Sequence, residues 1–125
     1  MSIAAAIRIT SPNEERVIER AAEFAQQQNT TLYIVSIVRE LPHGAQTDEE
    51  REIVQRNLEL IAKQGASPVF QEGDDIPQAL LVVARAFGVR TMFVQSGRTG
   101  PLGRSVAEQL LYLNPPFEIV IVGSE

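Results

Sequence analysis

The sequence predicts an α/β protein with an open five-stranded parallel sheet and helices on both faces. Two observations support this class. Strand-like and helix-like segments alternate along the 125 residues, and the strand-like segments are mostly continuous apolar runs rather than runs broken by polar residues. Strands that alternate with helices run parallel through right-handed crossovers, and parallel strands covered on both faces are apolar throughout. The length suits a single domain, which we expect to span residues 1–125.

The first strand and the first helix are predicted near the N-terminus. Residues 3–9, "IAAAIRI", form a short and largely apolar run. Behind this run, Ser11 is a suitable helix cap, Pro12 suits the first helical position and Glu14 completes a capping box. Apolar residues then recur at spacings of three and four as far as Gln28, which predicts a helix with Glu14 on its solvent side.

The rest of the chain repeats this alternation. Residues 31–38, "TLYIVSIV", are β-branched, aromatic and apolar, which indicates a buried strand. Thr47 and Glu50 form a capping box for the next helix, and Gly65 suits its left-handed end. The remaining elements are predicted as a strand at 67–73, a helix at 74–88, a strand at 89–95, a helix that begins with the capping box of Ser105 and Glu108 and ends before Asn114, and a last strand at 117–123.

The composition and charge of the chain exclude several kinds of functional site and partner. The chain has no cysteine and one histidine, which excludes disulfides, cysteine nucleophiles, thiolate metal sites and histidine clusters. A net charge of -5 opposes binding to nucleic acid or anionic lipid. No apolar stretch approaches the roughly 20 residues of a membrane-spanning helix, and no signal peptide pattern is present. We therefore expect a cytoplasmic protein with no membrane insertion, no nucleic-acid partner and no catalytic or metal site.

A glycine-rich segment, "VQSGRTGPLGRSVAEQLL" at 94–111, links the fourth predicted strand to a helix. Ligands of open parallel sheets bind at the carboxyl ends of the strands, where we also expect Thr10 and Ser11. Turned backbone N–H groups, arginine forks and a hydroxyl at a helix start suit a phosphate. A compact turn, with solvated arginines and a serine that only caps the helix, explains the same residues equally well. The candidate phosphate ligands are Gly97, Arg98, Thr99, Gly100, Gly103, Arg104 and Ser105.

Three segments in this order carry a family resemblance. They are "SPNEERVIERAAEFA" after the first strand, "GDDIPQALLVVARAFGV", and a glycine- and serine-rich turn that leads into "SVAEQLL". This layout, which covers almost the whole chain, resembles the universal stress protein family. Within that family the sequence is most similar to the universal-stress domain of osmosensitive potassium-uptake sensor kinases, which has comparable "GDD…ALL…AR" and "GSV…LL" segments.

The resemblance implies a fold, a ligand and an assembly. The fold is that of universal stress proteins and adenine nucleotide alpha hydrolases, with strand order 3-2-1-4-5. The implied ligand is ATP or another adenine nucleotide. The implied assembly is a homodimer in which the last strand, here Phe117 to Val122, pairs with its copy.

The nucleotide motif of the family is altered in this sequence. In nucleotide-binding members, a Gly-x2-Gly-x9-Gly-Ser/Thr signature holds the phosphates, and an aspartate at the end of the first strand meets the adenosine. With Ser105 and Val106 aligned to the start of the family helix, Arg104 replaces the last glycine, and six residues follow Gly97 where the family has nine. Ile9, next to Thr10 and Ser11, takes the place of the aspartate.

These observations predict a dimeric regulatory module that acts by association and has a weakened or altered adenine-nucleotide site. One alternative is a functional adenine-nucleotide sensor with a rearranged phosphate loop. A second is an accessory domain with a protein partner in an ion-transport or stress pathway. A slow ATPase is a third, although no histidine, base or pair of metal-binding carboxylates flanks the glycine turn.

Overall fold

Strands and helices alternate along the part of the chain that the structure, a computed structural model, describes: residues 1–96 and 105–123. None of the helices in these ranges is long and apolar enough to cross a membrane. The elements are β1 (Ser2–Ile7), α1 (Glu15–Gln28), β2 (Thr31–Val38), α2 (Asp48–Lys63), β3 (Ser67–Glu72), α3 (Ile76–Phe87), β4 (Val89–Gln95), α4 (Val106–Tyr112) and β5 (Glu118–Val122).

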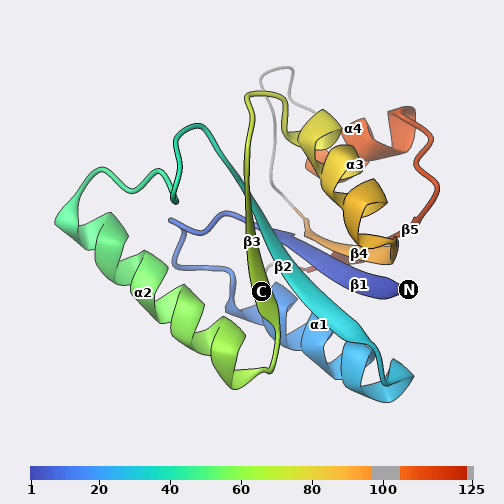
Figure 1. Ribbon diagram of the computed structural model, residues 1–125, viewed down its shortest axis with the longest axis horizontal. Helices are drawn as coiled ribbons and strands as arrows, with labels where there is room; N and C mark the ends of the chain where they lie inside the picture. The colour runs from blue at the N-terminus through green and yellow to red at the C-terminus, as the bar shows by residue number, and fades with distance from the viewer. Residues whose placement is uncertain (97–104, 124–125) are drawn as a thin grey trace.

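The five strands form one parallel sheet in the order β3-β2-β1-β4-β5, with β1 in the centre (Figure 1). Ala5 of β1 stands in register with Ile34 of β2 on one side and with Phe93 of β4 on the other. Ala4 and Ala5 are fully buried, since helices cover both faces of the central strand. The predicted α/β class and strand order are therefore confirmed.

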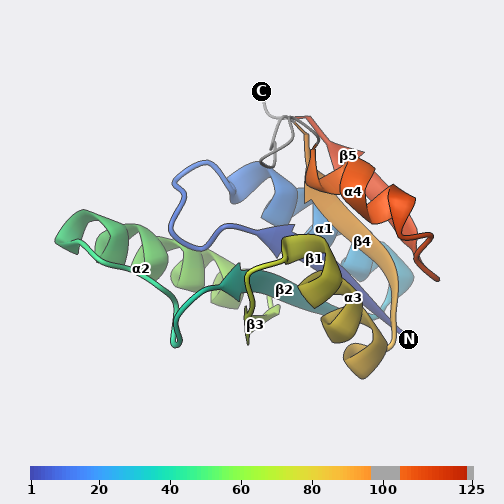
Figure 2. The same ribbon diagram turned by 90° about the horizontal axis from the view of Figure 1, so that it is seen from above.

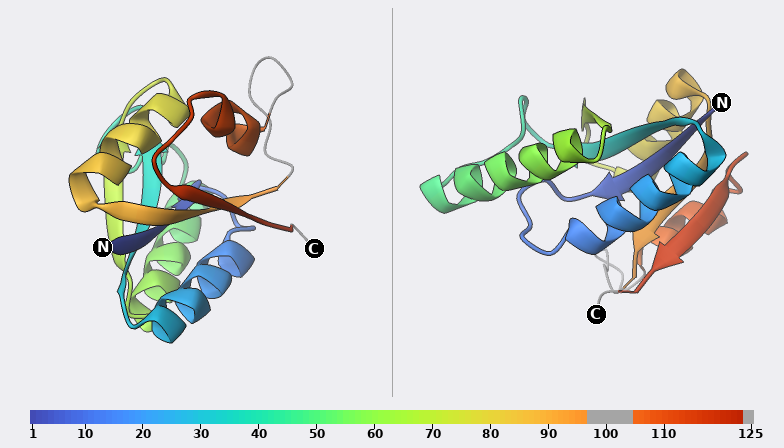
Figure 3. Two further views of the ribbon diagram at one scale, coloured as in Figure 1. Left: turned by 90° about the vertical axis from the view of Figure 1, so that its right-hand side faces the viewer. Right: turned by 90° about the horizontal axis from the view of Figure 1, so that it is seen from below.

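Two helical layers enclose the sheet. Helices α1 and α2 cover one face, and α3 and α4 cover the other (Figures 2 and 3). The first layer buries Ile18 and Ile61 against the sheet, and the second buries Leu80 and Leu110. Chain order therefore changes direction at β1, because β2 and β3 lie on one side of it and β4 and β5 on the other.

Most predicted helix ends are confirmed. The Thr47 hydroxyl oxygen accepts a hydrogen bond from the backbone N–H of Glu50 at 3.1 Å, so it caps α2. The Glu50 carboxylate accepts from the Gln46 N–H rather than from that of Thr47, which shifts the second half of the capping box by one residue. Gly65 and Gly88 follow α2 and α3 with φ of 73° and 64°, the left-handed conformation in which glycine has no steric penalty.

The start of α1 differs from the prediction. The helix begins at Glu15, and Glu14 occupies the N-cap position without a side-chain capping hydrogen bond. Its carboxylate instead accepts a hydrogen bond from the backbone N–H of Arg8, and the residue is fully buried rather than on the solvent side. The Ser11 hydroxyl accepts from the Asn13 N–H at 3.4 Å and closes a local turn instead of capping α1. The predicted capping box was wrong, because the buried Glu14 carboxylate binds the backbone N–H of Arg8 instead of the N–H of the predicted cap, Ser11.

Candidate functional site

Thr10 and Ser11 lie in the connection between β1 and α1, residues 8–14, which we name the β1–α1 loop. The loop leaves the carboxyl end of the central strand, at the point where the strand order changes direction. Ligands of open parallel sheets bind at such a switch point. Both Thr10 and Ser11 are half-buried. The fold therefore places this pair of predicted site residues at the edge of the sheet where a ligand is expected.

Asn57 of α2 holds the middle of this loop. Its Nδ2 donates hydrogen bonds to the carbonyl oxygens of Ile9, at 2.8 Å, and of Ser11, at 3.0 Å. Asn57 is only 6% exposed and lies one helical turn from Val54 and one from Ile61, the buried apolar residues of the same helix face. A buried amide is retained where its hydrogen bonds are satisfied, and here both donors are used on the loop.

Two further buried side chains hold the first part of the loop. The Ser36 hydroxyl of β2 accepts a hydrogen bond from the Ile9 N–H at 3.1 Å. The Glu14 carboxylate accepts from the Arg8 N–H, as described above. Ser36 is 3% exposed, and Ile9 itself is buried in the core beneath the loop. The loop is thus attached to β2 and α2 by side chains, and its own Glu14 folds back to reinforce it.

The loop is also attached to β4. The side-chain amide of Gln95, the last residue of β4, donates to the Asn13 carbonyl oxygen at 3.1 Å. The next residue, Ser96, donates its backbone N–H to the Val122 carbonyl oxygen of β5 at 2.8 Å. The end of the strand that leads into the glycine-rich segment is therefore beside the β1–α1 loop, as the parallel topology requires.

Thr10 is the residue of this loop whose hydrogen-bonding groups remain available. Within residues 1–96 and 105–123, neither its backbone N–H, its carbonyl oxygen nor its hydroxyl has a hydrogen-bond partner. The residues on either side are held through the Ile9 N–H and the carbonyl oxygens of Ile9 and Ser11. The loop thus carries, at one half-buried residue, a backbone donor, a backbone acceptor and a hydroxyl that its attachments to the described residues do not use.

The predicted phosphate ligands are divided between described and undescribed residues. Gly97, Arg98, Thr99, Gly100, Gly103 and Arg104 lie outside the described residues. Ser105 is the N-cap of α4, where its hydroxyl oxygen accepts from the Glu108 N–H at 3.1 Å. Val106 is the first helical residue and is buried. The predicted cap is confirmed, and a phosphate contact at Ser105 and Val106 stays a prediction.

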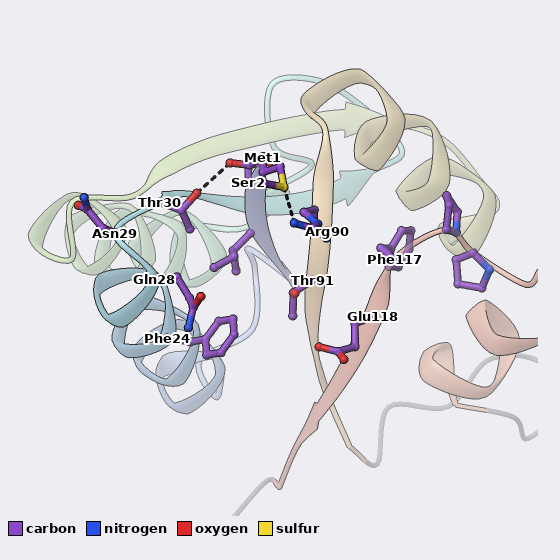
Figure 4. Close-up of a pocket in the computed structure, with 13 residues that line it drawn as sticks. Met1, Ser2, Phe24, Gln28, Asn29, Thr30, Arg90, Thr91, Phe117 and Glu118 are labelled. Carbon is purple, nitrogen blue, oxygen red and sulfur yellow. Dashed lines mark hydrogen bonds between the residues drawn. The ribbon is translucent and has the colours of Figure 1, made fainter.

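A separate open cavity of about 750 Å³ lies at the opposite, amino end of the strands (Figure 4). Its walls come from the end of α1, the starts of β1 and β4, and the turn before β5. Phe24 and Phe117 contribute apolar surface, and Gln28, Arg90 and Glu118 contribute polar surface. Thr10, Ser11, Ser105 and Val106, the predicted site residues that the structure describes, do not line it. No three histidine, aspartate or glutamate side chains of the described residues are grouped so that they could hold a metal ion.

Several solved structures share this architecture over their full length. A universal stress protein in complex with cAMP matches with a TM-score of 0.73 at 17% identity, covering 100% of this chain and 98% of its own. The chain has the universal stress protein fold. The universal stress protein from Archaeoglobus fulgidus matches with a TM-score of 0.67 at 23% identity over 97% of both chains. A structure of the Archaeoglobus universal stress protein in complex with dAMP matches with a TM-score of 0.66 at 22% identity, covering 97% of this chain and 96% of that one.

The universal stress protein fold is supported by structure alone. No protein-family model matches the sequence, and no curated protein matches it. Two of the universal stress proteins that share the fold were solved with nucleotides, and both nucleotides carry an adenine base and one phosphate. Adenine nucleotides are thus ligands of proteins with this architecture.

The sequence interpretation missed the side chains that hold the β1–α1 loop. Two signals were available. Asn57 follows Val54 by three residues and precedes Ile61 by four, so it is a polar residue on an otherwise apolar helix face. Ser36 interrupts the apolar run of β2 in the same way. Because buried polar groups need hydrogen-bond partners, a polar residue at a core position indicates that a partner lies nearby. Glu14 gave no such signal, since its position fitted a helix cap.

Proposed function

We propose that this protein is a regulatory module of the universal stress type that binds an adenine nucleotide and acts by association rather than by turnover. The observation that carries the proposal is the β1–α1 loop, which is held rigidly at the switch point of the sheet and leaves the polar groups of Thr10 available. A protein partner in a stress or ion-transport pathway is part of this proposal. The likeness to potassium-uptake sensor kinases stays a prediction from the sequence.

The chemistry of the base supports an adenine nucleotide. Adenine presents a ring nitrogen acceptor beside an amino donor, and this edge is complementary to the backbone N–H and carbonyl oxygen of one residue. Thr10, which is half-buried, carries an N–H and a carbonyl oxygen that have no partner within the described residues. Universal stress proteins with the same fold have been solved with cAMP and with dAMP, which share the adenine base. We therefore assign the base to the β1–α1 loop.

The phosphates are assigned to the residues that follow β4. In this assignment Arg98 and Arg104 would supply two guanidinium groups, and the glycines would allow backbone N–H groups to face the same phosphate. The segment is three residues shorter than the family signature, and Arg104 stands where the last glycine would be. We expect this altered spacing to weaken the affinity for a triphosphate, because fewer backbone donors reach it.

Calorimetric titration with ATP, ADP and AMP tests this function. We expect binding that is weaker than micromolar for each nucleotide, with one nucleotide per chain. ATP binding at micromolar affinity with this stoichiometry would contradict the weakened phosphate site. The absence of binding to all three would contradict the assignment of an adenine nucleotide. Release of inorganic phosphate from ATP that is lost in Ser105→Ala would instead show turnover.

A double variant tests the assignment of the phosphates. Replacing Arg104 and Ser105 together with alanine should abolish the rise in melting temperature that a nucleotide produces, since ligand binding stabilises only a fold that can bind it. Arg90→Ala is the matched control, because Arg90 is an exposed arginine at the start of β4, at the other end of the sheet. A rise that is unchanged in the double variant would assign the phosphate to other residues.

The second part of the proposal is a homodimer through β5. This strand pairs with β4 on one side and is the last in the order of the sheet, so its other edge carries backbone groups that a further strand could pair with. Ile121 on this strand is 54% exposed, although it is apolar. Pairing of β5 with the same strand of a second copy, as far as the Phe117 to Val122 segment reaches, would satisfy the edge and cover Ile121.

Sedimentation analysis of Ile121→Lys tests the dimer. A lysine on an edge strand opposes strand pairing, so we expect the variant to be monomeric at concentrations where the wild type is dimeric. Val82→Lys is the control, since Val82 is exposed to the same degree, 56%, but lies on α3. A dimeric Ile121→Lys variant, or a monomeric wild type, would contradict pairing through β5.

A further inference from the structure

We propose that Asn57 is a positioning residue for the nucleotide, which holds Thr10 in its binding conformation from the neighbouring helix α2. This inference rests on the proposed function. Asn57 does not need to touch the ligand. Its side-chain amide binds the carbonyl oxygens of Ile9 and Ser11, and these are the residues on either side of Thr10.

The geometry of the amide explains why this position needs asparagine. The Nδ2 atom carries two hydrogens, and each is directed to a different carbonyl oxygen of the loop, at 2.8 and 3.0 Å. An aspartate of the same size has no donor and would face two carbonyl oxygens with its own negative oxygens. A leucine would leave both carbonyl oxygens without their partner. Both changes remove the attachment while keeping the volume of the side chain.

Burial makes this attachment strong. Asn57 is 6% exposed and Ile9 is 2% exposed, so water competes little for the hydrogen bond between them. The Ile9 N–H is held from the other side by Ser36, which is also buried. Ile9 is therefore fixed through both of its backbone groups, by α2 and by β2. Ser11 is fixed through its carbonyl oxygen by the same amide as Ile9.

The consequence for binding is preorganisation. A loop that is held in its binding conformation before the ligand arrives requires no ordering when the ligand binds. If the loop without Asn57 occupies this conformation in about one molecule in ten, the apparent dissociation constant rises by about tenfold. The contacts to the nucleotide itself would be the same as in the wild type.

The test compares Asn57→Asp and Asn57→Leu with Val54→Ala. Val54 lies on the same face of α2, is 3% exposed and has an apolar side chain, so Val54→Ala weakens packing without changing a hydrogen bond of the loop. Titration calorimetry with AMP gives the dissociation constant, and hydrogen exchange of the hydrogen-bonded amides of Ile9 and Ser11 in the ligand-free proteins gives the local order on either side of Thr10. Asn57→Gln keeps both donors and serves as the conservative variant.

We expect both Asn57 variants to weaken AMP binding by about tenfold, and Val54→Ala to change it by less than about twofold. Exchange at the Ile9 and Ser11 amides, which are hydrogen-bonded, should be faster in Asn57→Asp and Asn57→Leu and unchanged in Val54→Ala, and Asn57→Gln should recover part of the affinity. If Asn57→Asp or Asn57→Leu does not fold, Asn57→Ala takes its place, and Asn57→Gln stays the conservative variant.

The outcomes separate this inference from the proposed function. AMP binding that Asn57→Asp leaves within about twofold of the wild type, or loss of affinity to the same degree in Val54→Ala, overturns the positioning role alone. A wild type that binds neither AMP, ADP nor ATP overturns the proposed function and the positioning of a nucleotide with it, even where exchange at Ile9 and Ser11 still depends on Asn57.

Discussion

The two ends of the sheet are built differently. At the carboxyl end, side chains from α2, β2 and β4 hold the β1–α1 loop over the central strand through Asn57, Ser36 and Gln95. At the amino end, the end of α1, the starts of β1 and β4 and the turn before β5 line an open cavity of about 750 Å³ (Figure 4). The predicted ligand residues Thr10 and Ser11 lie at the other end of the sheet.

The hydrogen bonds at the two ends of the sheet also differ. At the amino end, the Thr30 and Ser2 hydroxyls donate to the carbonyl oxygens of Met1 and Phe87, so these groups hold chain ends and turns together. At the carboxyl end, side-chain hydrogen bonds hold the loop and leave the polar groups of Thr10 without a partner among the described residues. In an open parallel sheet the carboxyl end is also where ligands bind. The predictions below compare the two ends directly.

The largest expected effect is that of the ligand. AMP at about one hundred times its dissociation constant should raise the free energy of unfolding by about 2.7 kcal/mol, because it binds only the folded protein. In NMR spectra its addition should shift the amide signals of Thr10 and Ser11 and leave those of Thr30 and Arg90 unchanged. Shifts concentrated at Thr30 and Arg90 would mean that the nucleotide occupies the open cavity instead.

A hydroxyl at each end gives the next comparison. Ser36→Ala removes the acceptor of the buried Ile9 N–H without adding volume and should lower the free energy of unfolding by about 1–3 kcal/mol. Thr91→Val at the cavity replaces a hydroxyl by a methyl group of the same size; within the described residues this hydroxyl has no hydrogen-bond partner, so the effect should stay within about 0.5 kcal/mol. Urea unfolding of both variants measures the difference. Equal losses would show that the two ends are held to the same degree.

The smallest effect is expected for two glutamines. Gln95→Met removes the hydrogen bond to the Asn13 carbonyl oxygen and should cost about 0.5–1 kcal/mol, because this bond is exposed to solvent. Gln28→Met, at the rim of the cavity, should change stability by less than about 0.5 kcal/mol. Thermal unfolding distinguishes them, and a neutral Gln95→Met would show that β4 does not hold the loop.

Much of the fold could be predicted from the sequence, because strand positions, helix caps and left-handed glycines depend on residues close together in the chain. The apolar run at 31–38 became β2 with the predicted bounds, and Gly65 and Gly88 adopt the left-handed conformation expected of them. The caps at Thr47 and Ser105 were also confirmed. These features depend on neighbours in the sequence, so propensity and periodicity are sufficient to find them.

The start of α1 could not be predicted in the same way. Ser11 and Glu14 fit a capping box by spacing, but Glu14 is drawn to the Arg8 N–H and is fully buried. The partners of Ser11 and Ile9 are 46 and 48 residues away, on α2. A capping rule compares residues only a few positions apart. It therefore cannot detect the hydrogen bonds by which Asn57 of α2 fixes the conformation of this loop.

The sequence by itself determined the α/β class, the parallel sheet and the presence of Thr10 and Ser11 behind its first strand. These follow from the alternation of apolar runs and amphipathic segments along the chain. Only the tertiary structure decided which groups around Thr10 are occupied and which are available. The reason is physical: the hydrogen bonds of the loop come from Asn57 of α2, Ser36 of β2 and Gln95 of β4, and these three elements meet only when the sheet has formed.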